Sequence, residues 1–239
     1  MAKMIPSDDV ASVTHPFIGL RAFSYRDRRF FFGREQQLEV LVPLSSGSRF
    51  VTIVGSSGSG KSSLVRAGLL PRLESSEHGF IWIECRPREA PIRELAQAIC
   101  SIGGTKGDYS EALTDRLELL LQKSSFGIRE AMSFIELERS AKLLILVDQF
   151  EEIFRLADLR LREEVNAAFA AETRDEAAAF VRLLLTAAQI SEYEIHIAIT
   201  MRSDFIGDCA RFHGLPEAVT ARVVAPERPD MVTSFRELR

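Results

Sequence analysis

A glycine- and serine-rich segment carries the clearest chemistry in this sequence. Residues 55–62 read GSSGSGKS and place glycine, glycine, lysine and serine at the four fixed positions of a phosphate-binding loop. Small residues let backbone N–H groups converge on a phosphate, and a helix starting near Lys61 adds its positive end. Lys61 is expected to reach the β- and γ-phosphates of a nucleotide as a catalytic residue, and the Ser62 hydroxyl to coordinate Mg²⁺. The alternative is a flexible turn between strand and helix. The predicted phosphate-binding residues are Gly55, Ser56, Ser57, Gly58, Ser59, Gly60, Lys61, Ser62 and Ser63.

Acidic residues follow a second apolar segment, LLILVDQFEE, in which Asp148 comes directly after the apolar run. Open parallel sheets bind ligands at the carboxyl ends of their strands, so Asp148 is expected to hold Mg²⁺ through water. Either Glu151 or Glu152 is predicted to orient or deprotonate the attacking water, and the sequence does not choose between them. The alternative is that both glutamates only favour the N-terminus of the next helix.

An arginine follows a third apolar segment, IHIAITMRSDF, on what should be the same edge of the sheet. There the guanidinium of Arg202 could contact the γ-phosphate. The equally weighted alternative is a solvated arginine or an ion pair with Asp204.

Further towards the N-terminus, residues 30–35 read FFFGRE. Residue chemistry alone favours core packing for the three phenylalanines and a helix start for Arg34 and Glu35.

The segments that must position these residues alternate between strand and helix. Near-continuous apolar strands separated by helices predict an α/β fold with a parallel sheet covered on both faces. The predicted strands span 49–55, 79–85, 142–148 and 194–201, with a weaker fifth at 221–226. The predicted helices span 34–44, 61–73, 92–99, 109–123, 128–138 and 159–190.

Composition limits the other possibilities. The chain has 239 residues and a formal net charge of −4 without a basic block, which argues against nucleic acid as the main partner. Its three cysteines, Cys85, Cys100 and Cys209, form neither a zinc spacing nor an even disulfide set, so a reducing cytoplasm fits best. No signal sequence or membrane span is apparent. Residues 1–15 are expected to be a flexible lead-in.

Four motifs together resemble the STAND class of signalling ATPases, and above all its bacterial novel-STAND group. They are PFIGLRAFSYRDRRFFFGRE, GSSGSGKSSLVRAGLLPRL, LLILVDQFEEIF and ITMRSDF, and the resemblance spans residue 16 to about 226. It implies a P-loop domain of the ASCE or AAA+-like type over 16–226. The implied architecture has three α/β/α layers and a five-stranded parallel sheet, with the phosphate-loop strand between the fifth strand and the Arg202 strand.

The same resemblance implies roles for individual residues. Gly33 and Arg34 would lie at the adenine and ribose end of the nucleotide, and Arg202 would sense the γ-phosphate. ATP as the nucleotide also rests on the resemblance, since no guanine-reading NKxD motif is present. Family members continue into a helical lid and a winged helix, so residues 227–239 are expected to start a truncated lid.

The resulting hypothesis is a slow, Mg-ATP-dependent switch ATPase that self-associates or acts on other domains of a larger chain. One alternative is a nucleotide-dependent scaffold that does not hydrolyse. Another is an AAA+-type ATPase acting on nucleic acid, which the net charge of −4 disfavours. A small-molecule kinase is the weakest option, because the acidic motif suits water as the nucleophile better than a substrate hydroxyl.

Overall fold

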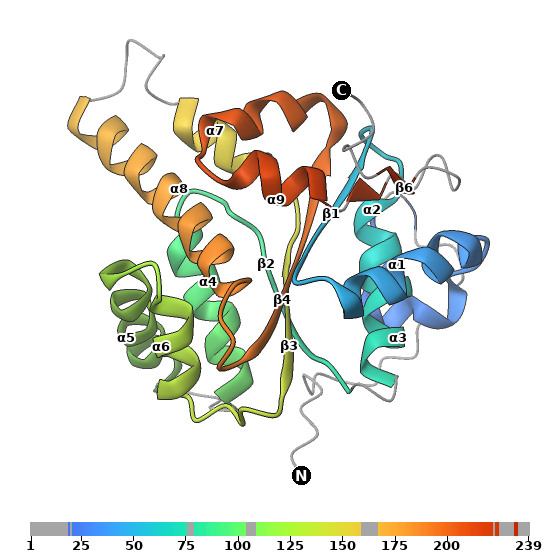
Figure 1. Cartoon of the computed structure of the whole chain (residues 1–239), viewed down its shortest axis with the longest axis horizontal. Helices are drawn as coiled ribbons and strands as arrows, with labels where there is room; N and C mark the ends of the chain where they lie inside the picture. Colours follow the sequence, from blue (N-terminus) through green and yellow to red (C-terminus); the bar gives the residue numbers. More distant parts are fainter. Residues whose placement is uncertain are drawn as a thin grey trace.

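A parallel sheet forms the centre of the computed structural model (Figure 1). Its long strands are β1 (Phe50–Gly55), β2 (Ile81–Cys85), β3 (Lys142–Val147) and β4 (Glu194–Arg202). They lie in the order β2-β3-β4-β1, and every neighbouring pair is parallel. The structure describes residues 19, 21–75, 79–103, 109–158, 167–221, 223–224 and 232–233.

The expected sheet of five parallel strands is confirmed only in part, because only four of its strands are long. The predicted strand at 221–226 contributes only the two-residue β5 (Val223–Val224), which runs parallel to β1. A further two-residue strand, β6 (Val232–Thr233), pairs antiparallel with β5. The expected neighbour order is confirmed, since β1 lies between β4 and β5. The lead-in predicted for 1–15 and the lid predicted for 227–239 lie outside the described residues, apart from the two in β6.

Burial explains why the apolar runs form strands. Every residue of β1 is buried, and so are all residues of β3 except the first, as expected for strands covered on both faces. Alternate β3 side chains enter two separate cores: Ile145 belongs to one, and Leu144 and Leu146 belong to the other. The edge strand β2 is less buried and exposes Ile81.

Helices cover both faces of the sheet and create the three layers seen in Figure 1. One face carries α4 (Pro91–Cys100), α5 (Tyr109–Lys123), α6 (Gly127–Phe134) and α8 (Ala167–Ala187). The other carries α1 (Glu35–Gly47), α2 (Lys61–Ser63), the π-helix η2 (Leu64–Leu69) and α3 (Leu70–Ser75). The remaining helical elements are η1 (Tyr25–Phe30), η3 (Ser101–Gly103), α7 (Glu152–Asp158), η5 (Ser203–Arg211) and α9 (Leu215–Ala221).

Several helix boundaries differ from the sequence prediction, two of them by the most. The helix predicted over 128–138 ends at Phe134, and Glu136 then has a left-handed backbone with φ 55°, which stops the helix. The helix predicted to begin at 159 is preceded by α7, which starts at Glu152. In the described part of the chain, no helix is both long and apolar enough to cross a bilayer.

Candidate functional site

The phosphate loop connects the end of β1 to the start of α2. Gly58 and Gly60 have φ values of 78° and 86°, a left-handed conformation that glycine adopts without steric cost. The Lys61 ammonium donates to the carbonyl oxygens of Gly55 at 2.9 Å and Ser56 at 2.7 Å, so the lysine lies across its own loop. The loop backbone is thus built for an anion, with a cation beside it.

Asp148 is brought directly against the phosphate-loop helix. It follows β3 and is fully buried, and its Oδ1 accepts hydrogen bonds from Ser62 Oγ at 2.8 Å and Thr200 Oγ1 at 2.6 Å. Ser62 and Asp148, 86 residues apart in sequence, therefore present adjacent oxygens. This donor set fits Mg²⁺, which binds through one or two protein oxygens while water and nucleotide phosphates supply the rest.

Two arginines contact the other oxygen of this carboxylate. Arg66 Nη2 lies 2.7 Å and Arg86 Nη2 lies 3.0 Å from Asp148 Oδ2. Arg66 also forms an ion pair with Glu84, with its Nε 2.9 Å from Oε1. Burial acts to lower the pKa of Arg66, but the hydrogen bond and charge of Glu84 and the charge of Asp148 raise it overall. Arg66 therefore stays charged.

The turn after Asp148 is held by the neighbouring strands. Gln149 has φ 61°, a left-handed conformation that is uncommon for a residue with a side chain. Its N–H donates to Thr200 Oγ1 at 3.0 Å, and the Phe150 N–H donates to the Thr200 carbonyl at 2.9 Å. On the other side, the Asp148 N–H donates to the Cys85 carbonyl at 3.0 Å. Such a strained turn persists because its surroundings hold it, a property common at functional sites.

The structure separates the two glutamates that sequence could not. Glu151 is 7% exposed, and its Oε2 has no hydrogen-bond partner among the residues that the structure describes. Burial raises the pKa of Glu151, although backbone hydrogen bonds, one of them from Arg202, and the Lys61 charge oppose this. Glu152 instead opens α7 and pairs with Arg155 at 2.5 Å. Glu151 therefore faces the phosphate-loop side. Glu152 lies at the start of a helix, which is the alternative role that the sequence analysis gave for the two glutamates.

The Arg202 side chain is engaged locally. Its Nε lies 3.1 Å and its Nη2 2.5 Å from the two carboxylate oxygens of Asp204, and the guanidinium lies over the Phe205 ring. In the sheet register Arg202 pairs with Gly55, so it sits beside the first residue of the phosphate loop. The hydrogen bond from Arg202 lowers the pKa of Asp204, and the Lys61 charge adds to this effect. Contact of Arg202 with a γ-phosphate stays a prediction.

The N-terminal aromatic segment also reaches the loop. Arg34 Nη2 donates to the Ser59 carbonyl at 3.2 Å, and Gly33, with φ 79°, allows the sharp turn before α1. The Phe23 N–H donates to Ser63 Oγ at 3.0 Å, so the Ser63 hydroxyl anchors this segment. The expected core packing of three phenylalanines is wrong for Phe32, which is 75% exposed. The adenine and ribose roles of Gly33 and Arg34 stay predictions.

Comparison with known proteins agrees with this geometry. Residues 16–234 match the family model described as Novel STAND NTPase 1. The chain belongs to this family. A search of curated proteins found no match. A solved structure, the Walker-type ATPase PABY2304 of Pyrococcus abyssi, matches with 16% identity and a TM-score of 0.34, covering 85% of this chain and 66% of that one. The chain thus spans slightly less than two thirds of that protein's length.

Several residues at the site of this novel STAND NTPase were not predicted from the sequence. They are Arg66, Glu84, Arg86 and Thr200. Arg66 stands four positions after Ser62, one helical turn away, and Arg86 directly follows a strand whose carboxyl end lies on the binding edge. Thr200 stands two positions before Arg202. For Arg86 and Thr200 the available signal was therefore a position near a strand end, and for Arg66 it was the helical spacing from Ser62.

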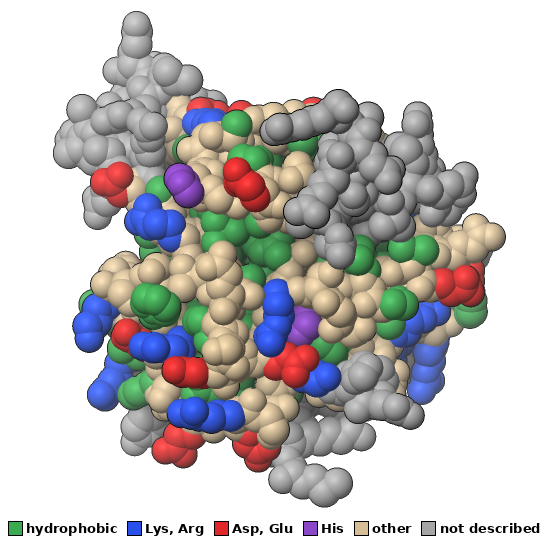
Figure 2. Space-filling model, viewed as in Figure 1, with side chains coloured by type: hydrophobic (Ala, Val, Ile, Leu, Met, Phe, Trp, Pro, Cys, Tyr) green, Lys and Arg blue, Asp and Glu red, His purple; other side chains and the backbone are tan. Residues whose placement is uncertain are grey.

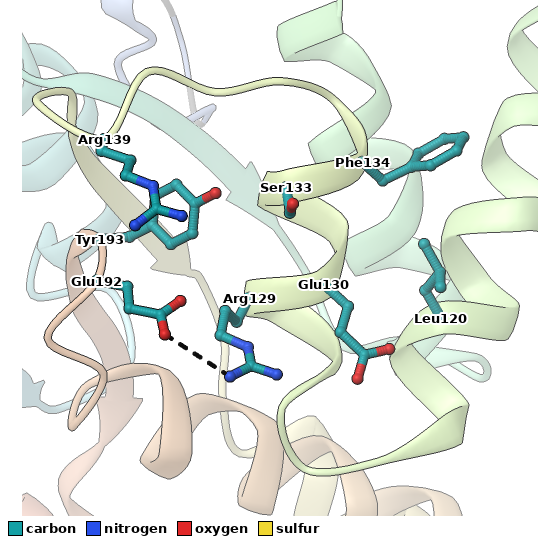
Figure 3. A pocket seen from close by; sticks show the side chains of 8 residues that line it. All are labelled: Leu120, Arg129, Glu130, Ser133, Phe134, Arg139, Glu192 and Tyr193. Atoms are coloured by element: carbon teal, nitrogen blue, oxygen red, sulfur yellow. Dashed lines mark ion pairs between the residues drawn. The ribbon is translucent and has the colours of Figure 1, made fainter.

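A cavity of about 440 Å³ lies at the opposite edge of the sheet in this NTPase (Figure 3). Arg139, which precedes β3, and Glu192 and Tyr193, which precede β4, contribute to its lining with residues of α5 and α6. The two arginines in Figure 3 are accompanied by two glutamates, and Arg129 lies 3.9 Å from Glu192. Because the phosphate loop follows the carboxyl end of β1, this cavity is not part of the candidate site.

Proposed function

We propose that this novel STAND NTPase is the core of an ATP-dependent switch that hydrolyses ATP slowly. The observation that carries the proposal is the convergence of Lys61, Ser62, Asp148 and Glu151 at one edge of the sheet, with a buried, unpartnered Glu151 oxygen. A buried carboxylate oxygen without a partner is costly, and such groups cluster at functional sites. ATP rather than another nucleotide rests on the family resemblance.

In this proposal each residue has a defined task. Lys61 and the N–H groups of the loop bind and orient the phosphates, and Ser62 with Asp148 holds Mg²⁺. Bound Mg²⁺ neutralises charge on the phosphate oxygens. The Glu151 carboxylate accepts a proton from the water that attacks the γ-phosphorus, while the bond to the ADP leaving oxygen breaks. Burial of Glu151 favours this role because it raises the pKa and so makes the carboxylate a better base.

The switch itself would use Arg202. A γ-phosphate beside the phosphate loop offers Arg202 a more highly charged partner than Asp204, so ATP would draw the guanidinium away from its ion pair. ADP would leave the pair intact. The β4–η5 junction would thus have two arrangements, and the terminal phosphate would favour one of them, as in a nucleotide switch. The ATP-bound arrangement would lead to self-association.

The first experiment identifies the nucleotide and tests turnover. Nucleotide extracted from the purified chain is identified by mass, and binding of Mg-ATP and Mg-ADP is measured by calorimetry with phosphate release in parallel. We expect recovered or bound adenine nucleotide, slow phosphate release, and loss of binding in Lys61→Ala. A folded chain that binds neither nucleotide contradicts the proposal.

A non-hydrolysing scaffold is the second candidate. It is favoured by the pairing of Arg202 with Asp204 and by the two arginines on Asp148, which describe a site set for binding more than for turnover. Phosphate release that disappears in the Glu151→Gln, Glu152→Gln double variant removes this candidate. The AAA+-type alternative on nucleic acid receives no support from the face in Figure 2, where basic and acidic side chains of the described residues are interspersed.

A further inference from the structure

The two arginines on Asp148 are held very differently. Arg66 is tied to Glu84 through both its Nε, at 2.9 and 3.1 Å, and its Nη2, and its side chain is 15% exposed. Arg86 reaches Glu84 only at 4.0 Å, and its side chain is 32% exposed. The 3.0 Å contact with Asp148 is therefore the principal ion pair of Arg86, whereas Arg66 is fixed with or without it.

A divalent cation at Ser62 and Asp148 must share one carboxylate with these two guanidinium groups. Both oxygens of Asp148 are already used, Oδ1 by two hydroxyl donors and Oδ2 by two arginines. Cations that share a buried carboxylate repel each other strongly, because little water screens them. The arginine with fewer other contacts is the one that yields.

We propose that Arg86 is a positioning residue that competes with Mg²⁺ for Asp148 and leaves the carboxylate when the metal–nucleotide complex binds. This inference rests on the proposed function, because it assumes that Mg²⁺ and nucleotide occupy the phosphate loop. Metal binding at Asp148 thereby depends on a movement of Arg86 at the carboxyl end of β2.

A neighbouring cavity gives the displaced side chain a place to go. A space of about 290 Å³ lies beside the end of β2 and is lined by Arg66, Glu84, Cys85, Arg86, Arg88 and Glu94. Among the described residues, the exposed Arg88 is the only ion-pair partner of Glu94, which lies on α4, at 3.6 Å. Arg86 can turn from Asp148 towards this carboxylate and stay paired. The metal at Asp148 is then coupled to the segment that joins β2 to α4.

The test is the Mg²⁺ dependence of ADP binding by the full chain. Calorimetry at a series of free Mg²⁺ concentrations gives the Mg²⁺ midpoint for tight ADP binding, and a series in EDTA gives the metal-independent affinity. For Arg86→Ala we expect the Mg²⁺ midpoint to fall about tenfold, since changes beside a metal ligand alter metal affinity by 10- to 100-fold. ADP affinity in EDTA should stay within about twofold, which a general structural defect would not allow.

Matched variants keep the result interpretable. Arg129→Ala removes an arginine at the opposite edge of the sheet, where it pairs with Glu192, and should leave the midpoint unchanged. Arg86→Gln, which keeps the length but not the charge, should lower the midpoint as Arg86→Ala does, and it carries the test if the alanine variant does not fold. Arg86→Lys should restore the midpoint towards that of the unmodified chain. An unchanged or higher midpoint in a folded Arg86→Ala or Arg86→Gln variant overturns the inference. Failure of the unmodified chain to bind ADP at all overturns the proposed function as well.

Discussion

Buried polar groups have different contacts at the two ends of the parallel strands. We call the end where the strands begin the amino edge and the end where they finish the carboxyl edge. At the amino edge, His196 on β4 is 3% exposed, with Nδ1 2.9 Å from the Ser48 carbonyl and Nε2 3.3 Å from Glu194. At the carboxyl edge, Glu151 is nearly as buried, but its Oε2 has no hydrogen-bond partner in the described part of the chain. Ser45 Oγ at the amino edge also lacks a partner within the described ranges, yet a neutral hydroxyl is far less costly to bury than a carboxylate.

This contrast separates structure from function. A buried imidazole whose nitrogens have partners stabilises the fold and needs nothing further. A buried carboxylate beside a lysine, a second carboxylate and a glycine-rich loop is stabilised only in part, so a ligand or a reacting water can complete its contacts. Substitutions at the carboxyl edge should therefore change nucleotide chemistry, and those at the amino edge should change stability.

The largest expected effect is that of Lys61→Ala. Removing the ammonium takes away charge-assisted hydrogen bonds worth about 1.5–3 kcal/mol each, so ATP affinity should fall by about 100-fold or more. Lys142→Ala is the matched control at the amino edge, where Lys142 lies 3.4 Å from Glu194, and it should leave affinity unchanged. Calorimetry measures both. Equal losses in the two variants would erase the contrast between the edges.

Next comes Glu151→Gln, which should lower phosphate release by about 100-fold while ATP still binds, because a general base is lost. Glu152→Gln, which removes only the partner of Arg155, should keep at least half of the activity. The reverse pattern would show that the buried carboxylate is not the base.

The pH dependence of turnover tests the same residue. Burial raises the pKa of Glu151, so the base should lose its charge, and turnover should fall, at a higher pH than for an ordinary glutamate. The folded state binds this proton more tightly than the unfolded state does. The charged carboxylate therefore destabilises the fold above the raised pKa, and the penalty disappears as pH falls through it. Thermal unfolding of Glu151→Gln at neutral pH should accordingly show equal or greater stability than the unmodified chain.

At the amino edge, His196→Ala should lower the free energy of unfolding by about 2 kcal/mol, because it removes two kinds of hydrogen bond and leaves a cavity beside Phe80. Urea titration followed by circular dichroism measures this change. ADP affinity of the folded variant should stay within about twofold, and a much larger loss would mean that the two edges are coupled.

A smaller effect is expected for Thr200→Val, which removes a donor to Asp148 and an acceptor for the Gln149 N–H. The Mg²⁺ midpoint for ADP binding should rise about tenfold. Thr52→Val makes the same change on adjacent β1 and should be neutral or stabilising, because the buried hydroxyl has no partner among the described residues. If both valine variants behave alike, the hydrogen bonds of Thr200 do not position Asp148.

The smallest effect is that of Asp204→Asn. An exposed ion pair is worth about 1 kcal/mol at most, so freeing Arg202 should raise the affinity for ATP relative to ADP by about threefold. Asp208→Asn, on the same helical segment beside Arg211, serves as the control and should leave the ratio unchanged. A lower ATP-to-ADP preference in Asp204→Asn would contradict the proposed switching role of Arg202.

Local sequence was sufficient for most of the elements and for selecting Lys61, Ser62 and Asp148, which the structure brings to one edge of the sheet. The run GSSGSGKS predicts a turn because glycine tolerates a left-handed backbone. Strands β1 and β3 can be recognised as continuous apolar runs because both their faces are buried. The α/β class with a parallel sheet, the family and the adjacency of Ser62 to Asp148 follow from these local signals. The length of strands β5 and β6 does not follow from local signals, because the pairing of a two-residue strand depends on the strand beside it.

The partner of each charged group, by contrast, depends on the tertiary structure. DQFEE names two glutamates, but burial and an ion pair with Arg155 distinguish Glu151 from Glu152. Arg66 and Arg86 lie 82 and 62 residues before Asp148 in the sequence, and only the packing of the phosphate-loop helix and β2 against β3 brings them to its carboxylate. Residue type and spacing determine which groups can bind phosphate, whereas pKa and pairing depend on neighbours that are distant in the chain.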